Sequence, residues 1–315
     1  MTWLRRAVVP LFAVCVALAT GVGLGTGPLR SSPAASDSVQ LSERNAVLAD
    51  QVHDLRQLSV FGEGVADAAT PSWLGESLKG RSVTLVALAG VATDTVGGFH
   101  DAVTQAGGVV AATVLVSSDY DDPGKKTYVE SVADGSIVGL KDLADAAAGK
   151  DPYAEAGALV ARAYVGHVNQ SSLDDEAVKV DSELQGAKLV DVRGELTRRG
   201  SLAIVLSSGD HANDDTTRAR HLIQDALVSA LAVGADAVVV STPSSGSQAG
   251  GLLEALDADK RLRLLPVSTI NVQQGAAARV GTLYALTAAL SGQGGDYGVE
   301  GSDVVLPPGM TTAQQ

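Results

Sequence analysis

Apolar and polar positions follow three different patterns along the chain. Residues 7–24 contain no charged residue. Residues 40–58 repeat an apolar residue at every seventh position, with charged residues between the repeats. From residue 81 onward, short continuous apolar runs alternate with segments of helical periodicity, which indicates buried parallel strands covered by helices. The pattern therefore predicts a membrane segment, an amphipathic helix and an α/β domain, in that order.

The apolar stretch near the N-terminus is long enough to cross a membrane, because a spanning helix needs about 20 mostly apolar residues. Arg5 and Arg6 precede it. The positive-inside rule keeps these arginines in the cytoplasm and sends the rest of the chain outward. A cleaved signal peptide is the alternative, since residues 17–19 offer small side chains at a cleavage spacing. We expect residues 1–25 to be a single-pass membrane anchor of a cell-envelope protein, with the C-terminal domain extracytoplasmic.

We predict a linker and a coiled-coil stalk over residues 26–60. The linker is rich in Gly, Ser, Pro and Ala, a composition typical of flexible tethers. The helix after it carries an apolar seven-residue repeat, typical of a short coiled coil. The repeat consists of Leu41, Leu48 and Leu55, with Val52 between them. Such a helix either assembles into a homo-oligomer or docks on its own domain, and the sequence favours neither. Gly62, Gly64 and Pro71 predict a loop after it.

We predict an α/β domain over residues 81–291, with a helical insertion at about residues 122–186. The first part reads strand, helix, strand, which is a βαβ unit. Beyond the insertion, strand–helix alternation resumes three times after a short extra strand. The expected strands are residues 83–89, 109–116, 188–192, 202–207, 236–241 and 264–268. These elements predict about five parallel strands with helices on both faces, a doubly wound sheet. Residues 292–315 show little periodicity and predict a flexible tail.

The charge of the chain limits its partners. The 315 residues include 36 acidic and 23 basic side chains, for a net charge of −13 at pH 7. Phosphate contacts need a basic face, so we expect no nucleic-acid partner and no adsorption of the domain to anionic lipid. The single cysteine, Cys15, lies in the apolar segment, so the chain has neither a disulfide framework nor a cysteine-based zinc site.

Polar loops follow three of the predicted strands and should lie at one edge of the sheet, where such folds bind ligands. The candidate pocket residues are Ser207, Asp210, His211, Ser241, Ser244 and Asn271. Their hydroxyls, together with backbone amides and helix N-termini, are able to hold an anion. The same residue types also cap helices without any ligand. Both readings remain open, and no phosphate-binding glycine motif accompanies them, so no cofactor is evident.

An enzyme is not indicated. The pair Asp210-His211 suggests acid–base chemistry, but a hydrolase also needs a nucleophile oriented by the histidine. The chain has no G-x-S-x-G nucleophile elbow. We therefore expect no catalytic residues and no enzymatic activity, and keep an envelope hydrolase as the least favoured alternative.

Metal ligands are sparse along the chain. None of the five histidines pairs with another at i+3 or i+4, and Met1 and Met310 are the only methionines. Copper(I) prefers clustered thiolates, thioethers and imidazoles, and the sequence has no such cluster. Asp119, Asp121 and Asp122 offer hard oxygen ligands around Tyr120, or else form a solvated loop. The metal-binding residues, if any, stay unknown at this stage.

The two ends of the chain resemble a known family. Arg5 and Arg6, the apolar run ending ALATGVGLGTGPL and the helix after it resemble the start of the mycobacterial copper transport protein B family. The stretch STINVQQGAAARVGTLYALTAALSGQGGDYGV is similar to that family's C-terminal end. The order of parts between them is also similar, so the resemblance covers essentially the whole chain. It carries no metal-ligand motif.

The resemblance implies a cell-envelope protein of actinobacteria, described as an outer-membrane pore for copper efflux and copper resistance. Copper ion is then the transported species and the membrane a partner. One apolar helix alone cannot line a pore, so transport would need assembly of the N-terminal helix and stalk, or a separate transporter. A membrane-anchored scaffold or ligand-binding module without transport activity is the alternative.

Overall fold

The computed structural model describes residues 37–137, 151–211, 214–300 and 303–310. The chain divides into two compact units, Met1–Val65 and Ala66–Gln315. The expected anchor at residues 1–25 and the linker up to residue 36 lie outside the described residues. Among the residues that are described, no helix is both long and apolar enough to span a membrane.

Helix α2 (Asp37–Leu74) is longer than the sequence predicts. A loop was expected around Gly62, Gly64 and Pro71, and the helix instead continues through all three. The loop prediction is therefore wrong. A glycine inside a helix costs about 1 kcal/mol relative to alanine, and the last turns offset this by burial. Their buried stripe, spaced at i, i+4 and i+8, is Ala66, Thr70 and Leu74.

The second unit contains an eight-stranded sheet in the order β3-β2-β1-β4-β5-β6-β7-β8. The strands are β1 (Ser82–Ala87), β2 (Val109–Val116), β3 (Val190–Arg193), β4 (Leu202–Leu206), β5 (Ala237–Ser241), β6 (Val267–Ile270), β7 (Asp296–Glu300) and β8 (Asp303–Val305). Neighbouring strands pair in parallel, except that β3 runs antiparallel to β2 and β8 to β7. β1, β4 and β5 are buried along their whole length, as their continuous apolar runs predict.

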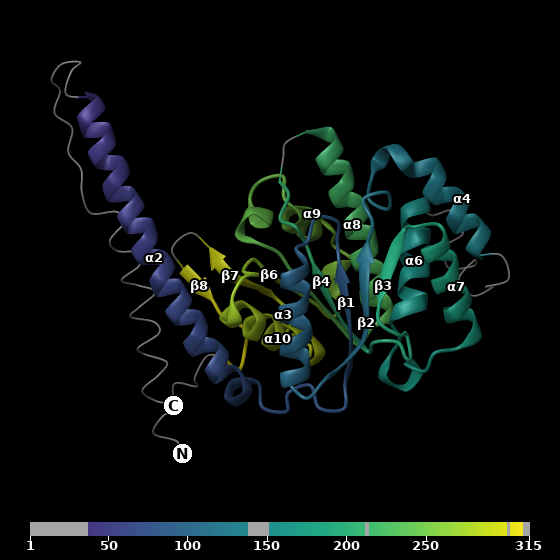
Figure 1. Ribbon diagram of the computed structural model, residues 1–315. Helices are drawn as coiled ribbons and strands as arrows, with labels where there is room; N and C mark the ends of the chain where they lie inside the picture. The colour runs from purple at the N-terminus through teal and green to yellow at the C-terminus, as the bar shows by residue number, and fades with distance from the viewer. Residues whose placement is uncertain (1–36, 138–150, 212–213, 301–302, 311–315) are drawn as a thin grey trace. The chain divides into compact units, whose positions relative to one another are not determined.

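Helices cover both faces of the sheet, so the fold is a doubly wound α/β sheet (Figure 1). Helices α3 (Thr93–Gln105) and α10 (Ala276–Leu290) pack on one face, in an aliphatic core with Phe99. The other face carries α4 (Lys126–Ile137), α6 (Pro152–Tyr164) and α7 (Asp175–Gly186) of the insertion, then α8 (Asp215–Gly234) and α9 (Leu252–Ala258).

The expected helical insertion consists of α4 (Lys126–Ile137), α6 (Pro152–Tyr164) and α7 (Asp175–Gly186), with residues 138–150 outside the described part. Helix α6 packs closely on α8. A Cβ placed on Gly157 would lie 3.2 Å from the carbonyl oxygen of Ala226. The glycine therefore allows the two helices to approach each other, and this close packing holds the insertion against α8.

The C-terminal segment differs from the flexible tail that its sequence indicates. Residues 292–315 contain β7 and β8, which add a hairpin to the edge of the sheet. Both strands are short and mostly exposed to solvent. Their sequences therefore show little alternation of apolar and polar residues. β7 and β8 raise the six expected strands, five parallel and one short extra strand, to eight. The hairpin joins the sheet because β7 pairs with β6. Backbone pairing of this kind produces no pattern of side chains in the sequence.

Candidate functional site

The carboxyl ends of β1 and β4 form a topological switch point. The chain leaves β1 into α3 on one face and leaves β4 into α8 on the opposite face. Doubly wound sheets bind ligands beyond such a point. Here the two loops touch: Gly90 has φ of 88°, and a Cβ on it would lie 3.2 Å from Ser208 Cβ. Only glycine combines that backbone conformation with that approach.

Ser207 and Ser241 end adjacent strands and are brought together through the backbone. The amide of Ser207 donates to the carbonyl of Ser241 at 3.0 Å. Gln273, which the sequence analysis did not single out, lies across both strand ends. Its Nε2 donates to the carbonyl oxygens of Ser207 at 3.0 Å and Ser241 at 2.8 Å. The buried amide thus fixes the loop between β6 and α10 onto the edge of the sheet.

Asp210 pairs with an arginine that the sequence analysis also missed. Arg220, on α8, places Nη1 3.6 Å from Asp210 Oδ2 and Nε 3.9 Å from Asp121 Oδ1. Gln224, one turn further along α8, donates to Asp121 Oδ2 at 2.6 Å. Burial raises the pKa of Asp121, while the Gln224 hydrogen bond and the Arg220 charge oppose the rise. The i, i+4 spacing of Arg220 and Gln224 on a polar face is the signal that could have found them.

The aspartates around Tyr120 do not act as one cluster. Asp121 faces α8, whereas Asp119 lies 3.9 Å from Lys125 Nζ. Asp122 accepts a hydrogen bond from the amide of Gly124 at 2.8 Å and caps a short 3₁₀ turn. Within the part of the chain that the structure describes, no group of three or more His, Cys, Asp or Glu side chains is arranged to hold a metal ion.

The two histidines near this edge have different surroundings. His211 is exposed, and its backbone forms an isolated bridge with Gly251. His221, on α8, is buried. Burial lowers the pKa of His221, and the Asp210 carboxylate opposes that shift. His221 is therefore a neutral buried group, because its burial outweighs the effect of the Asp210 carboxylate.

Ser244 and Asn271 serve the local fold. The carbonyl of Ser244 accepts a hydrogen bond from Ser247 Oγ at 2.8 Å. Asn271 Nδ2 donates to the carbonyl of Val299 at 2.8 Å, and the Val299 amide donates to Asn271 Oδ1 at 2.8 Å. The side chain of Asn271 thereby mimics a backbone strand and extends the pairing of β6 with β7. Its neighbour Gly298 has φ of 119°, and a Cβ there would overlap Asn271 Oδ1.

Three of the six predicted pocket residues fall into two groups: Ser207 and Ser241 adjoin Gln273, while Asp210 adjoins Arg220. The other three, His211, Ser244 and Asn271, join neither group. Ser207 Oγ accepts from the amide of Gly209 at 3.2 Å. No hydroxyl of the set pairs with His211 in the hydrogen bonds of the described residues, so the geometry there does not form a nucleophile–base pair. A ligand at this edge remains a prediction.

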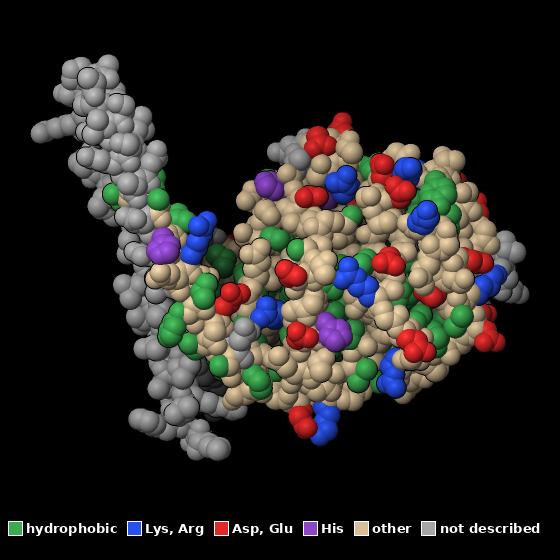
Figure 2. Space-filling view, in the orientation of Figure 1, with side chains coloured by type: hydrophobic (Ala, Val, Ile, Leu, Met, Phe, Trp, Pro, Cys, Tyr) green, Lys and Arg blue, Asp and Glu red, His purple; other side chains and the backbone are tan. Residues whose placement is uncertain are grey.

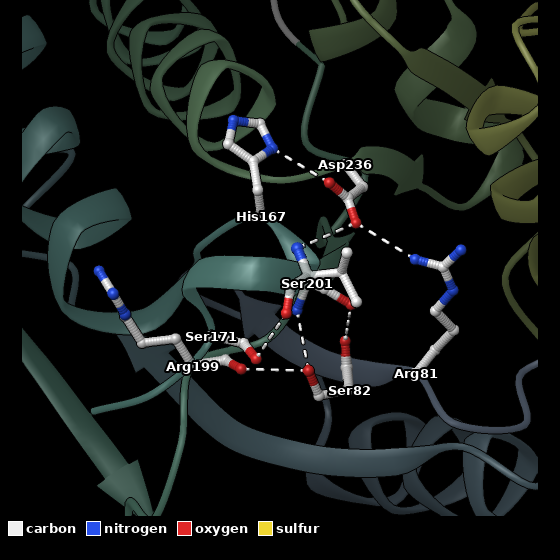
Figure 3. A network of polar contacts seen from close by, with 8 residues as sticks. Arg81, Ser82, His167, Ser171, Arg199, Ser201 and Asp236 are labelled. Carbon is white, nitrogen blue, oxygen red and sulfur yellow. Dashed lines mark hydrogen bonds and ion pairs between the residues drawn. The ribbon is translucent and has the colours of Figure 1, made fainter.

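A second polar network lies at the opposite, amino edge of the sheet. Figure 3 shows His167 and Arg81 approaching Asp236 from different sides. Asp236 Oδ1 lies 3.1 Å from His167 Nδ1, and Oδ2 accepts from Arg81 Nη1 at 3.3 Å and from the amide of Val168 at 3.2 Å. Because a carboxylate only accepts, Nδ1 of His167 carries the hydrogen. The network ties the segment that follows α6 to the starts of β1 and β5, which is a structural role.

Charged side chains are mixed on the surface of the second unit. Figure 2 shows acidic and basic groups interspersed over the visible face of the α/β unit. Several ion pairs there are exposed on both sides, such as Lys126 with Asp151 at 2.7 Å. Exposed pairs contribute roughly 0–1 kcal/mol each. The surface charge therefore supports solubility more than a specific electrostatic docking site.

The fold and this edge define a doubly wound α/β protein preceded by a long helix, whose residues up to Val65 belong to a separate unit. The model of a protein family, MctB, described as a copper transport outer membrane protein, matches residues 1–308. The chain therefore belongs to the MctB family of copper transport outer membrane proteins, and the family resemblance of its two ends is confirmed. No curated protein sequence matches the chain.

Proposed function

We propose that this protein acts in copper efflux and copper homeostasis at the cell envelope. The observation that carries the proposal is the family match over residues 1–308, which includes the apolar N-terminal segment, the stalk and the α/β unit together. In this proposal residues 7–24 anchor the chain as a single pass, and the α/β unit lies outside the cytoplasm. The outer membrane enters through the description of the family.

The α/β unit is proposed as a binding and assembly module. Its two layers are filled by fully buried aliphatic side chains on both faces of the sheet, including Leu85, Val205 and Val239. Protein interiors of this kind are close-packed, so an ion path through the centre of the sheet is not part of the proposal. Copper would pass instead through an assembly of N-terminal segments or through a partner transporter.

The proposed assembly requires the stalk to associate with other copies of itself. Leu48 and Val52 belong to the apolar seven-residue repeat of α2, and their side chains are 56% and 42% exposed. Apolar stripes at this spacing pair with another helix in coiled coils. A membrane segment shortly before the stalk would hold all copies in the same orientation, which favours a parallel homo-oligomer.

The test is genetic complementation in the organism that carries the gene. Deletion should lower the copper concentration at which growth stops, and the full-length gene should restore it. A chain of residues 26–315 should fail to restore it, because the anchor is missing. Zinc tolerance is the control and should not change. Unaltered copper tolerance after deletion would contradict the proposal.

A second function is supported by the polar strand-end edge with Gln273, Asp210 and Arg220. The protein would then be an anchored ligand-binding module or scaffold that does not itself move copper. In that case deletion of the gene would leave the copper content of the cells unchanged, while the purified full-length protein would still bind its ligand measurably. A hydrolase has no such support, since the strand-end hydroxyls lack a histidine partner among the described contacts.

A further inference from the structure

His221 is a buried histidine to which the proposed function gives no role. It lies in the second turn of α8 and is only 4% exposed. The other four histidines of the chain, His53, His100, His167 and His211, are exposed. Burial disfavours the charged form of an imidazole. A proton on His221 therefore favours an arrangement that exposes the ring to water.

The ring of His221 connects α8 to two loops at the carboxyl edge of the sheet. It forms hydrogen bonds with the backbone of Asp210, in the loop after β4, and with the backbone of Gly250, in the loop after β5. A backbone bridge between His211 and Gly251 joins the same two loops. These contacts hold the loop after β5 against α8 and against the loop after β4.

Charged side chains around the ring form a chain of ion pairs. Asp210 Oδ2 lies 3.6 Å from Arg220 Nη1, and Asp121 Oδ1 lies 3.9 Å from Arg220 Nε. Both distances are longer than hydrogen bonds, so this cluster is loosely held. The other ionisable groups on the segments around the ring are His211 of the loop after β4, Asp225 of α8 and Glu254 of α9.

Protonation of the ring is disfavoured while the loops are closed. Burial is the largest cause and lowers the pKa of His221 below its ordinary value of 6.5. The Asp210 carboxylate and the two backbone hydrogen bonds oppose this shift, and the Arg220 charge adds to it. A ring exposed to water regains its ordinary pKa. As pH falls through about 6.5, an open arrangement therefore takes up a proton that the closed one does not, and the equilibrium shifts toward opening.

We propose that His221 is a pH switch: when it binds a proton, the loop after β5, residues 242–251, separates from α8. This loop carries Ser244, and the loop after β4 carries Asp210 and His211. Opening therefore rearranges the polar edge where the sequence predicts a ligand pocket. The neutral ring keeps this edge closed at neutral pH. Such regulation goes beyond the proposed role in copper homeostasis.

Two carboxyl groups act in the opposite direction. Burial raises the pKa of both Asp121 and Asp225. Each therefore binds its proton more tightly in the closed, folded arrangement than in water, and through these groups acid favours closure. A loss of protection against exchange at acid pH is thus assigned to His221 and not to these carboxyl groups.

The test is hydrogen–deuterium exchange of the full-length protein in detergent, read by mass spectrometry at about pH 7.5 and about pH 5.5, on either side of the ordinary pKa of histidine. Protection is the ratio of the intrinsic exchange rate at each pH to the observed rate. Peptides covering residues 242–251 should lose about three- to tenfold in protection at the lower pH, since uptake of one proton shifts the equilibrium by at most tenfold per unit of pH. Peptides of α3, on the opposite face of the sheet, should keep their protection.

Two variants assign the effect to His221. His221→Gln keeps a hydrogen-bond donor at the position of the ring but cannot become charged, so its protection should be the same at both pH values. His211→Gln is the matched control, because it removes the exposed histidine at the same edge. It should lose protection at the lower pH as the unmodified protein does.

Asp210→Asn keeps the test independent of any folding defect in His221→Gln. The Asp210 side chain is exposed, and its carboxylate favours the protonated ring in the closed arrangement. Without this charge, the loss of protection at the lower pH should be larger. Equal protection at both pH values in the unmodified protein would overturn the proposal. So would an equal loss in His221→Gln and the unmodified protein, or a smaller loss in Asp210→Asn.

Discussion

Asp225, on α8, is a buried carboxyl whose Oδ1 lacks a hydrogen-bond partner among the described residues. Asp225 is only 7% exposed. Burial, aided by the nearby Asp259 charge, raises the pKa of Asp225 to about 6. The folded protein therefore binds a proton there between about pH 4 and pH 6, where the unfolded chain has already released it. As pH rises through this range, the unfolded chain is stabilised by ionisation of this carboxyl while the folded protein keeps its proton, so the free energy of unfolding falls.

We predict that Asp225→Asn is more stable than the unmodified protein at pH 7, by about 2 kcal/mol. The difference should shrink as pH falls from 6 toward 4 and approach zero below about pH 4, where the carboxyl is protonated in the unfolded state as well as in the folded state. Urea unfolding at a series of pH values measures it. Asp257→Asn, at an exposed position, is the control. Parallel pH profiles for Asp225→Asn and the unmodified protein would show that Asp225 is not a buried titrating group.

Gly298 is needed because its backbone conformation and its contact with Asn271 both exclude a side chain. Gly298→Ala should lower the free energy of unfolding by about 2–4 kcal/mol, through backbone strain and overlap with Asn271 Oδ1. Gly194→Ala is a matched control, since Gly194 has φ of 86° with open space around its Cβ position. It should cost only about 1 kcal/mol. Equal losses of stability would mean that the Asn271 contact is unimportant.

The residues of the strand-end edge could be predicted only where they lie at the end of a strand or shortly after it. Ser207, Asp210 and Ser241 do so. Gln273 and Arg220 do not: one lies in a loop and the other on a helix. Their partners are distant in sequence, as with Gln224 and Asp121, whose hydrogen bond joins residues 103 positions apart. Such pairs depend on how the helices are laid over the sheet, which residue type and local spacing do not encode.

At the scale of elements, continuous apolar runs predict the central strands well because those strands are buried on both faces. The sequence does not predict β7 and β8, because both strands are short, lie at the edge of the sheet and are held by backbone pairing. Helix α2 runs past Gly62, Gly64 and Pro71 because its final turns bury Ala66 and Leu74 against the α/β unit. Tertiary burial overrides local helix propensity in that segment.

The stalk carries a prediction of its own. In a chain with Cys15→Ser, a single cysteine in place of Val52 should form disulfide-linked dimers under mild oxidation. Val52 lies in the apolar stripe, and stripe positions of two parallel helices face each other. His53→Cys, the next residue and likewise exposed, should cross-link several-fold less. Equal or absent cross-linking in both variants would favour docking of the stalk on its own domain.

For the whole molecule, one family model matches the apolar N-terminal segment, the stalk and the α/β unit together, and the proposed role in copper efflux rests on that match. If the N-terminal segment is the anchor, its loss should release the protein from the membrane without unfolding the α/β unit, whose core is built from residues beyond 65. Carbonate extraction of membranes from cells with the full-length chain and with residues 26–315 distinguishes the two. Recovery of both chains in the membrane pellet would contradict a single N-terminal anchor.

The most direct measurement of the proposed function is the copper retained by cells after loading with copper and washing. Cells without the gene should retain more copper than their parent, and the full-length gene should restore the lower content. Retained zinc should be the same in all three strains. Equal copper retention with and without the gene would contradict a role in copper efflux.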